Sequence, residues 1–347
     1  MAKFLITIDV EGHVGNNPID HLMLGIEKNG TDYGCYYMHN EMSKRHISSI
    51  FFIDFALFYQ HKITSKMNDF LKILKISDSC ALHIHPDHIL DGQRKYLYQY
   101  SNEEQKYILS KCGLMYETVM GKKPNMFRAG VYSANNLLIN NLPDSIKFDL
   151  SENWINEHCK INITNKTNFL ACYNNVIEIP AFIIKPSIFG GKLTKLDLGL
   201  PHRTFKHFIN LIIKHASFAN EYICIFFHSH SLLNWRNNPN CPTHGCYKVK
   251  NFLKNIDFLS CYKDMVISQD SLMKDSEHLM KNLIGRNNDG VILKEKNILR
   301  SVLYIVNTIL LNYKNSSKIR NQIRTFLLVS ISIVVLIVVV ILLCVLL

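Results

Sequence analysis

Short apolar runs, each followed by polar residues and a turn or a helical segment, recur along most of the chain. The first three are KFLITIDV (3–10), ISSIFFIDF (47–55) and CALHIHP (80–86). Runs of the same character are NMFRAG (125–130), IKFDLS (146–151), NVIEIPAF (175–182), YICIFFHSHS (222–231) and DMVISQ (264–269). Such runs are typical of strands buried on both faces of a parallel sheet. Because helical patterns alternate with them, the sequence predicts an α/β fold whose sheet is open or closed into a barrel.

The polar side chains that follow these runs have the composition of a hydrolytic metal site. They are Asp9, Glu11, His83, His85, His88, Arg128, Asp149, His228 and His230. In parallel α/β folds, functional groups collect at the carboxyl ends of the strands. We therefore expect these residues to meet at one end of the sheet.

Asp9 and Glu11 lie two positions apart in TIDVEGH. If the strand continues through them, both side chains point to one face. One carboxylate would then bind a metal ion, and the other would take a proton from water. The sequence does not decide which acid has which role, and a lone D-x-E pattern also occurs in solvated turns.

His83 and His85 form a similar pair in HIHPDH. Two neutral imidazoles at a strand end are suitable partial ligands for a divalent ion, most naturally Zn²⁺. Pro86 ends the strand, and His88 follows as a possible third ligand or as a partner of a ligand. The alternative is a group of ordinary surface histidines.

Arg128 and His228 complete the set. An arginine beside paired carboxylates keeps a base ionised and fixes its orientation. A histidine after a buried strand, such as His228 in CIFFHSHS, is suited to protonate a leaving amine. Each residue taken alone is equally compatible with an ordinary surface arginine or strand-end histidine.

The motifs TIDVEGH, LHIHPDH, FRAG and FFHSHS, in this order, resemble the successive motifs of the polysaccharide deacetylase family, the NodB-homology carbohydrate esterases. SSIFFI and VIEIPAF resemble two further strands of that family. The family's usual first motif has adjacent aspartates, and its usual second motif separates the histidines by three residues. The H-x-H-P-D-H pattern resembles a branch with an LHIHP motif.

The resemblance implies a deformed (β/α) barrel of about seven strands. It also implies metal-dependent hydrolysis of an N-acetyl group from an amino sugar, in a glycan or a glycan precursor. By this resemblance Asp9 is the base, Arg128 orients it, and His228 is the acid. Glu11, His83, His85 and His88 are the candidate metal ligands, and which of His83, His85, Asp87 and His88 bind the ion stays open.

Two other functions remain compatible with the same residues. One is a deformylase or another amidohydrolase that acts on a lipid-linked sugar. The other is a catalytically inactive barrel that serves as a membrane-tethered binding module. The released acid, acetate or formate, distinguishes the enzymes, and loss of a catalytic residue would indicate the inactive barrel.

The end of the chain, residues 325–347, contains no charge, glycine or proline. A helix of about 20 apolar residues spans a bilayer, so this stretch predicts a transmembrane anchor. Lys318, Arg320 and Arg324 precede it, which predicts that the preceding domain lies in the cytoplasm. We therefore expect a catalytic domain (1–284), a basic linker and helix (285–324) and the anchor (325–347).

The net charge of +11 is concentrated before this anchor, since residues 291–324 contain seven basic residues and one acidic residue. A nucleic-acid partner is therefore not needed to explain the charge. The sequence does not indicate the oligomeric state.

The ten cysteines are scattered, and no secretory pattern precedes the first run, so a reducing compartment is expected. Cys241, His244 and Cys246 in CPTHGC could be half of a zinc site. A second ligand pair at zinc-finger spacing is missing, so incidental thiols in a loop are the other interpretation.

Overall fold

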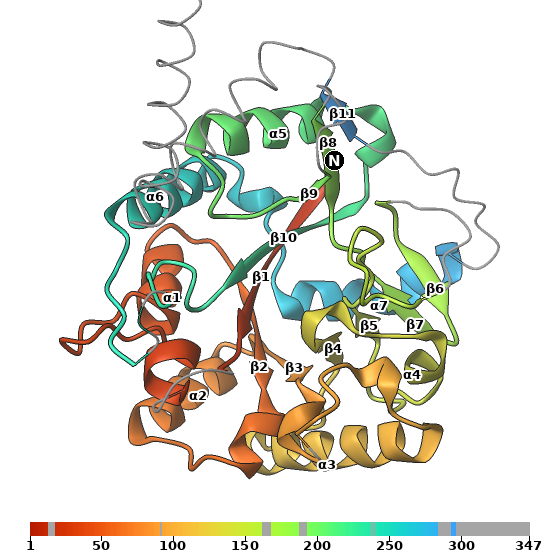
Figure 1. Ribbon diagram of the computed structural model, residues 1–347. Helices are drawn as coiled ribbons and strands as arrows, with labels where there is room; N and C mark the ends of the chain where they lie inside the picture. Colours follow the sequence, from red (N-terminus) through yellow and green to blue (C-terminus); the bar gives the residue numbers. More distant parts are fainter. Residues whose placement is uncertain are drawn as a thin grey trace, which may run out of the picture.

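The computed structural model describes residues 1–12, 18–90, 92–161, 168–186, 193–236, 238, 240–283 and 293–295. Among these residues, eight strands form one curled sheet at the centre of the molecule (Figure 1). Its strands are β1 (Lys3–Val10), β2 (Ile50–Asp54), β3 (Cys80–Ile84), β4 (Met126–Ala129), β5 (Phe148–Asp149), β6 (Ala171–Tyr173), β7 (Val176–Glu178) and β10 (Tyr222–His228).

The strand order of this sheet is β10-β1-β2-β3-β4-β5-β7-β6. All neighbours run parallel except β6 and β7, which are antiparallel. Just after β7, Ala181 forms a single parallel bridge with Cys224 of β10. The chain thus connects the two ends of the parallel part of the sheet, as expected for a deformed (β/α) barrel.

Helices α1, α2 and α3 follow the edge of the molecule in Figure 1, outside this sheet, whereas α7 lies near its centre. The helices are α1 (Cys35–Ser43), α2 (Ser65–Ile76), α3 (Asn102–Met120), α4 (Asn136–Asn140), α5 (His202–Lys214), α6 (Cys246–Ser260) and α7 (Gln269–Leu283). A second, three-stranded sheet has the order β11-β8-β9, built from β8 (Ile183–Pro186), β9 (Thr194–Lys195) and β11 (Leu293–Glu295).

Helix α3 shows how local sequence sets the element boundaries. The Ser101 hydroxyl accepts the backbone N–H of Glu104, and the Glu104 carboxylate accepts the backbone N–H of Ser101. This reciprocal capping satisfies two donors that the first turn leaves unpaired. At the other end Gly121 adopts a left-handed conformation with φ 73°, which ends the helix at little steric cost.

The two faces of the sheet carry different parts of the core. Along β1, Phe4 and Ile8 pack in the large core beneath the helices, whereas Leu5 belongs to a second apolar cluster. Leu272 of α7 belongs to this second cluster too, so α7 packs against the inner face near the start of the strands. Further along the same inner face the side chains become polar, beginning at Thr7. The polar side chains of the predicted site therefore lie on the inner face of the sheet, beyond its apolar part.

One of the predicted strands is absent. In DMVISQ, residues Lys263–Met265 form a 3₁₀ turn, and Val266 makes a single parallel bridge to Phe4. The Ile267 N–H donates to the Phe4 carbonyl oxygen at 2.9 Å. The segment leaves the sheet after this contact because helix α7 begins at Gln269.

The predicted anchor (325–347) lies outside the described residues. Among the helices of the described ranges, none combines the length and apolarity that crossing a bilayer requires. Of the predicted linker (285–324), the structure describes strand β11, which pairs in parallel with β8. This segment therefore contacts the preceding part of the chain.

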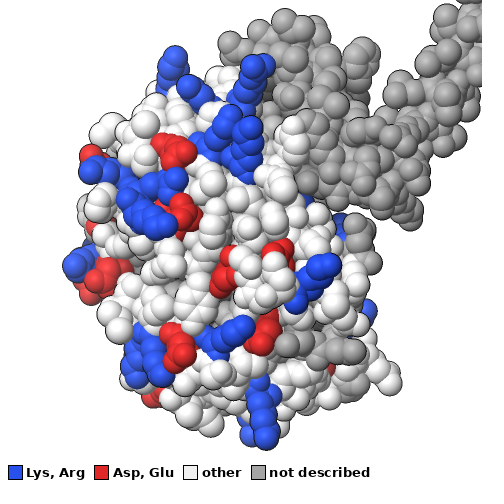
Figure 2. Space-filling model, turned by 90° about the vertical axis from the view of Figure 1, so that its left-hand side faces the viewer, with Lys and Arg blue, Asp and Glu red and all other residues white. Residues whose placement is uncertain are grey.

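Lys and Arg side chains are interspersed with Asp and Glu side chains on the face of the molecule shown in Figure 2. Arg45, which follows α1, forms ion pairs with residues of α1 and α6. Arg45 contacts Glu41 at 2.8 Å and Asp257 at 2.6 Å. Opposite charges on this part of the surface therefore pair with one another.

Candidate active site

Eight of the nine predicted strand-end residues come from the carboxyl ends of strands β1, β3, β4 and β10 or from the residues that follow them. The backbone register places Asp9 opposite His228, and His83 opposite Arg128. Asp9, Glu11, His85 and His228 line one cavity of about 410 Å³. The structure thus brings the acids, the histidines and the arginine to the same end of the sheet, as the spacing predicts.

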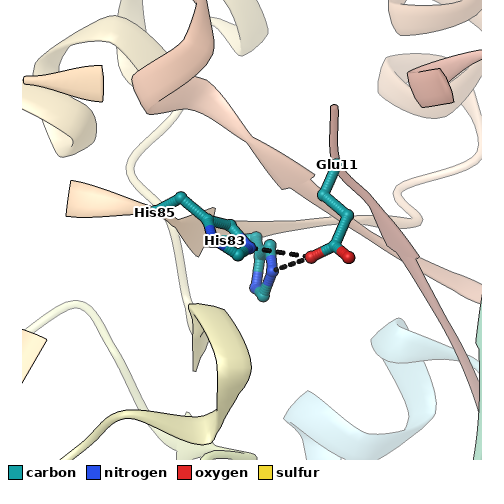
Figure 3. A group of neighbouring side chains, drawn as sticks. All are labelled: Glu11, His83 and His85. Atoms are coloured by element: carbon teal, nitrogen blue, oxygen red, sulfur yellow. Dashed lines mark hydrogen bonds and ion pairs between the residues drawn. The ribbon is translucent and has the colours of Figure 1, made fainter. Parts of the chain in front are cut away.

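Glu11, His83 and His85 form the centre of this site, with both imidazole rings directed at the Glu11 carboxylate (Figure 3). Glu11 Oε2 lies 2.7 Å from His85 Nε2 and 3.3 Å from His83 Nε2. All three side chains are buried. Three potential metal-ligating atoms of these residues lie within 4.8 Å of one another.

The His83 ring is oriented by the neighbouring strand. Its Nδ1 lies 2.9 Å from the backbone carbonyl oxygen of Arg128, which can only accept a hydrogen bond. Nδ1 therefore carries the proton, and in the neutral ring Nε2 presents a lone pair towards Glu11. Two electron-rich atoms 3.3 Å apart fit a cation placed between them. The donor set of one carboxylate and two imidazoles is one that Zn²⁺ and similar ions prefer.

Glu11 also belongs to a second group of three potential ligands, with His228 and His230. His228 Nε2 lies 3.4 Å from Glu11 Oε1, and the rings of His228 and His230 stack at 5.0 Å. Glu11 therefore contacts β3 through one carboxylate oxygen and β10 through the other. No sequence argument singled out His230 as a ligand.

His88 lies apart from both groups. The short turn Pro86–His88 directs its ring towards Asp54, with His88 Nε2 3.6 Å from Asp54 Oδ2. Its Nδ1 lies 3.1 Å from Gln60 Oε1. Asp54 in turn accepts a hydrogen bond from the backbone N–H of His85 at 3.2 Å. The structure therefore brings together Glu11, His83 and His85, but not His88, and its predicted metal ligation stays a prediction.

Asp9 is bound by Arg128 rather than by the histidines. Arg128 Nη1 lies 2.5 Å from Asp9 Oδ1, and the two side chains are almost completely buried. Removing either member of such a pair leaves an uncompensated buried charge, which typically costs about 3–5 kcal/mol. The sequence left open which acid is the base and which is the metal ligand. In the structure Asp9 lies beside the Arg128 cation, and Glu11 lies beside imidazole rings.

Arg128 is held by several groups besides Asp9. Its Nε donates to the Leu150 carbonyl oxygen at 3.2 Å, and Nη2 donates to the Thr7 hydroxyl at 3.0 Å. The guanidinium also lies 4.3 Å from the centre of the Phe52 ring. Burial lowers the pKa of Arg128, but the Asp9 carboxylate outweighs this effect and raises the pKa above its ordinary value. The arginine is therefore a fixed positive charge at the bottom of the site.

The surroundings shift the pKa values of Glu11, His85 and His228 in different directions. Burial raises the pKa of Glu11, but His85 and His228 outweigh it and hold the pKa well below its ordinary range. Burial lowers the pKa of His85, but Glu11 outweighs it and raises the pKa to about 9. For His228, burial lowers the pKa more than Glu11 and Asp9 raise it. Without a bound ion, His85 would therefore carry a proton at neutral pH.

This proton predicts how metal affinity depends on pH. A metal-ligating imidazole must be neutral, so binding displaces the His85 proton at any pH below about 9. We expect the affinity for Zn²⁺ to rise about tenfold per pH unit between pH 6.5 and 8.5, because one proton is exchanged. Competition with a chelating dye at each pH measures this slope. The His88→Gln variant should show the same slope, and a flat profile in the unaltered chain would contradict the assignment of His85 as a ligand.

The turn after β4 brings backbone close to the metal-ligand candidates. A Cβ atom on Gly130 would lie 2.7 Å from the Ile84 carbonyl oxygen and 2.8 Å from the His85 ring, so only glycine fits there. The next two residues, Val131 and Tyr132, have φ of 54° and 57°. Left-handed conformations are costly for such side chains and are concentrated at functional sites. Both residues line the cavity.

Several residues of the cavity carry no sequence signal. Lys195 lies 3.5 Å from the centre of the Phe226 ring, and its ammonium donates to the Tyr132 hydroxyl at 3.4 Å. Burial lowers the pKa of Lys195, partly offset by Asp197 and Asp9. The lysine comes from β9, which pairs with β8 outside the main sheet, so the strand-end argument does not apply to it. Asn156 and Tyr96 line the cavity from loops in the same way.

Asp149, the remaining strand-end acid, belongs to a separate buried group with Glu152 and Glu178. Asp149 and Glu178 are neighbours in the register of β5 and β7, and the Glu152 N–H donates to Glu178 Oε1 at 2.8 Å. Burial raises the pKa of Asp149 to about 6. Burial and the Asp149 charge raise the pKa of Glu152 to about 8. Asp149 and Glu152 therefore keep their protons at pH values at which ordinary carboxyl groups have lost them.

This group predicts a pH-dependent stability. Both folded-state pKa values exceed the ordinary values of 3.8 and 4.5, so the folded chain binds more protons than the unfolded chain. The free energy of unfolding should therefore fall as the pH rises from about 4.5 to 8. Glu152→Gln removes one such group and should be as stable as the unaltered chain at pH 4.5. At pH 8 it should be more stable by up to about 4 kcal/mol.

Chemical denaturation at both pH values measures this difference. Glu157→Gln is the matched control, because the Glu157 side chain is 87% exposed. It should change stability little at either pH. A Glu152→Gln effect that is equal at both pH values would contradict the raised pKa.

The fold has counterparts among solved structures. A Mycobacterium smegmatis protein assigned as a polysaccharide deacetylase superposes with a TM-score of 0.51 at 11% identity, covering 84% of this chain and 96% of that one. Peptidoglycan deacetylase PdaC from Bacillus subtilis gives 0.39 at 11% identity, covering 82% and 96%. A family 4 carbohydrate esterase from Streptomyces lividans gives 0.39 at 8%, covering 77% and 91%.

In sequence, no family model matches the chain. No curated protein matches it in sequence either. The structural likeness to the Mycobacterium smegmatis protein extends over most of both chains, and at this identity it is evidence on the fold. The chain therefore has the fold of a polysaccharide deacetylase, which is the fold that its motifs predict.

Proposed function

We propose that this chain hydrolyses an N-acetyl group from an amino sugar, in a glycan or a glycan precursor, and releases acetate. The observation that carries the proposal is the joint placement of two units at one cavity. The first unit is the Asp9–Arg128 pair, and the second is the Glu11–His83–His85 group. The cavity volume of about 410 Å³ lies within the usual range of small-ligand pockets. The fold supports the proposal at the level of the reaction class.

Glu11, His83 and His85 are the proposed ligands of a divalent ion, most naturally Zn²⁺. Such an ion supplies a Lewis acid that polarises an amide carbonyl group and makes a nearby water molecule more acidic. Glu11 offers one oxygen to both imidazoles, and the Arg128 carbonyl oxygen fixes the His83 ring. These contacts preorganise the ligands, so little rearrangement is needed when an ion binds.

Asp9 is the proposed base. Arg128 contacts Asp9 Oδ1, so the carboxylate is oriented and Oδ2 is left to take the proton of the attacking water. Arg128 also compensates the negative charge of Asp9 within the buried site. The same guanidinium is fixed by Thr7 and by the Leu150 carbonyl oxygen, which limits the movement of the pair.

His228 is the proposed acid that protonates the departing sugar amine. It is the register neighbour of Asp9 and lines the same cavity. Because its pKa is lowered by burial, the ring is mostly neutral in the free protein at pH 7. The neutral His228 ring must therefore take up a proton within the site before it can donate one to the sugar amine. The neighbouring Glu11 Oε1, at 3.4 Å, stabilises the protonated ring.

A screen of acetylated amino sugars tests the proposal. The full chain, supplied with Zn²⁺, is incubated with free, nucleotide-linked and lipid-linked N-acetyl amino sugars. Acetate and formate are measured separately. Acetate release that disappears with a chelator supports the proposal. Formate release from N-formyl sugars alone would instead show a deformylase, and no product with any substrate class would favour an inactive barrel.

A further inference from the structure

A second group of chemically active side chains lies in the loop before α6 and involves Cys246, His244 and Glu27. Cys246 is the first residue of α6, and its side chain is exposed. Cys246 Sγ lies 3.6 Å from His244 Nε2. The other ring nitrogen, His244 Nδ1, lies 2.9 Å from Glu27 Oε2. The three side chains therefore form a chain of contacts from thiol to imidazole to carboxylate.

Glu27 fixes the tautomer of His244. Its side chain is 7% exposed, and Oε2 accepts both the His244 backbone N–H at 3.0 Å and the ring nitrogen. Burial raises the pKa of Glu27, but the hydrogen bonds from His244 outweigh it and lower the pKa. Glu27 is thus a carboxylate and can only accept, so Nδ1 carries the proton. His244 Nε2 then presents its lone pair to the thiol.

The surroundings hold this arrangement in place. The Tyr33 ring stacks on the His244 ring with centroids 4.2 Å apart and planes at 17°. The Lys28 N–H donates to the Pro242 carbonyl oxygen at 2.8 Å, which ties the Glu27 loop to the His244 loop. His244 also forms an antiparallel bridge with Leu233. The imidazole therefore has both its rotation and its position restricted.

Cys246 lies at the N-terminus of helix α6. At the N-terminus of a helix the unpaired N–H groups and the helix dipole stabilise a negative charge. Helix α6 has 15 residues, so its dipole is well developed. A negative charge that forms on Sγ during reaction would thus lie at this helix end, and His244 Nε2 is placed to receive the thiol proton. Nucleophilic cysteines are found in such surroundings.

We propose that Cys246 is a nucleophilic thiol that exchanges with low-molecular-mass disulfides and is thereby a site of reversible modification. The Cys246 proton moves to His244 Nε2, and the thiolate attacks one sulfur of the disulfide. The disulfide bond breaks as the new bond to Sγ forms. The other half leaves as a thiolate and takes the proton from His244. Glu27 stabilises the positive charge that His244 carries in between.

A zinc site in CPTHGC is less well supported by the geometry. The contacts of His244 use both ring nitrogens, one for Glu27 and one for Cys246. Among the described residues, the groups of three ligand atoms within 4.8 Å of one another do not include these residues. The contacts instead connect a thiol (Cys246) to a base (His244), and the base to a carboxylate that orients it (Glu27). Nucleophilic cysteine sites have this arrangement.

Cys261 provides an internal control in the same chain. It is also exposed, and it occupies the C-terminal cap of the same helix, where the dipole disfavours a thiolate. Its Sγ contacts the Asp257 carbonyl oxygen at 3.8 Å. Cys246 and Cys261 thus differ in their helix terminus and in the presence of a histidine.

The experiment exposes the full chain at pH 7 to a small amount of glutathione disulfide. Mass spectrometry of the peptides then gives the rate of mixed-disulfide formation at each cysteine. We expect Cys246 to react at least about tenfold faster than Cys261. Equal rates at the two cysteines would overturn the proposal, and this comparison needs no variant.

Variants separate the contributions of the neighbours. His244→Gln should reduce the Cys246 rate to about that of Cys261, and Glu27→Gln should reduce it several-fold. The Cys261 rate in the same sample should stay constant, and the fully buried Cys80 should stay unmodified, which shows that the variant is folded. A His244→Gln chain with an unchanged Cys246 rate would overturn the role of His244 as the base.

Discussion

Asp9→Asn is expected to reduce the rate of N-acetyl hydrolysis by about 10²- to 10⁴-fold, the usual contribution of a positioned general base. Asparagine has the size of aspartate but cannot take a proton from water. Because Glu11 and the histidines are unchanged, Zn²⁺ affinity should stay within a few-fold of the original value. Acetate release and metal affinity, measured on the same preparation, test both statements. A variant with undiminished turnover would rule out Asp9 as the base.

The control for this experiment concerns stability, because Asp9→Asn leaves the Arg128 cation buried without its counter-charge. That change alone is expected to destabilise the fold by about 3–5 kcal/mol. In Asp9→Asn/Arg128→Met the uncompensated charge is gone, so stability should recover while turnover stays low. If turnover recovers with stability, the loss in the single variant was a folding effect.

His83→Ala and His85→Ala are each expected to weaken Zn²⁺ binding by at least about 100-fold and to remove turnover in limiting metal. Each variant deletes one of the three atoms that surround the proposed ion position. Equilibrium dialysis at fixed pH measures the affinity, and acetate release measures the activity. Excess metal should restore part of the activity if the ligand is the only function lost.

His88→Ala is the matched control, since His88 is the third histidine of the same motif but contacts Asp54 and Gln60 instead. The arrangement of the described residues predicts little change in affinity for this variant. A loss as large as that of His83→Ala would show that His88 is a ligand after all. Retained affinity in His83→Ala and in His85→Ala would contradict the proposed metal site.

The strands were predictable from sequence because a strand buried on both faces has to be apolar at nearly every position. KFLITIDV corresponds to β1 residue for residue, and the runs near residues 50, 80 and 222 contain β2, β3 and β10. The alternation along β1 also predicted that Asp9 and Glu11 share a face, and both line the cavity. These features depend only on residues that are neighbours in the chain, so they can be predicted from the sequence.

Other features depend on contacts that no local pattern records. DMVISQ has the composition of a strand. It forms a single β-bridge, between Val266 and Phe4, before α7 begins. The direction of His88 depends on the turn after Pro86, where spacing no longer fixes the face. Lys195 reaches the cavity from β9, which pairs with β8, and nothing in the sequence around it indicates this. Tertiary geometry, rather than residue type, decides these positions.

Strand β1 has β2 on one side and β10 on the other, and this has a consequence for the order in which the molecule is made. β1 and β10 are far apart in the chain, as shown by the contact between Lys3 and Tyr222, which are 219 positions apart. During synthesis β1 emerges before β10, so the pairing between them forms only after β10 is made. Glu11, His83 and His85 come before β10 in the chain, whereas His228 arrives only with β10. The three candidate metal ligands can therefore come together before β10 is made, whereas the complete cavity needs a contact between segments far apart in the chain, and such contacts slow folding.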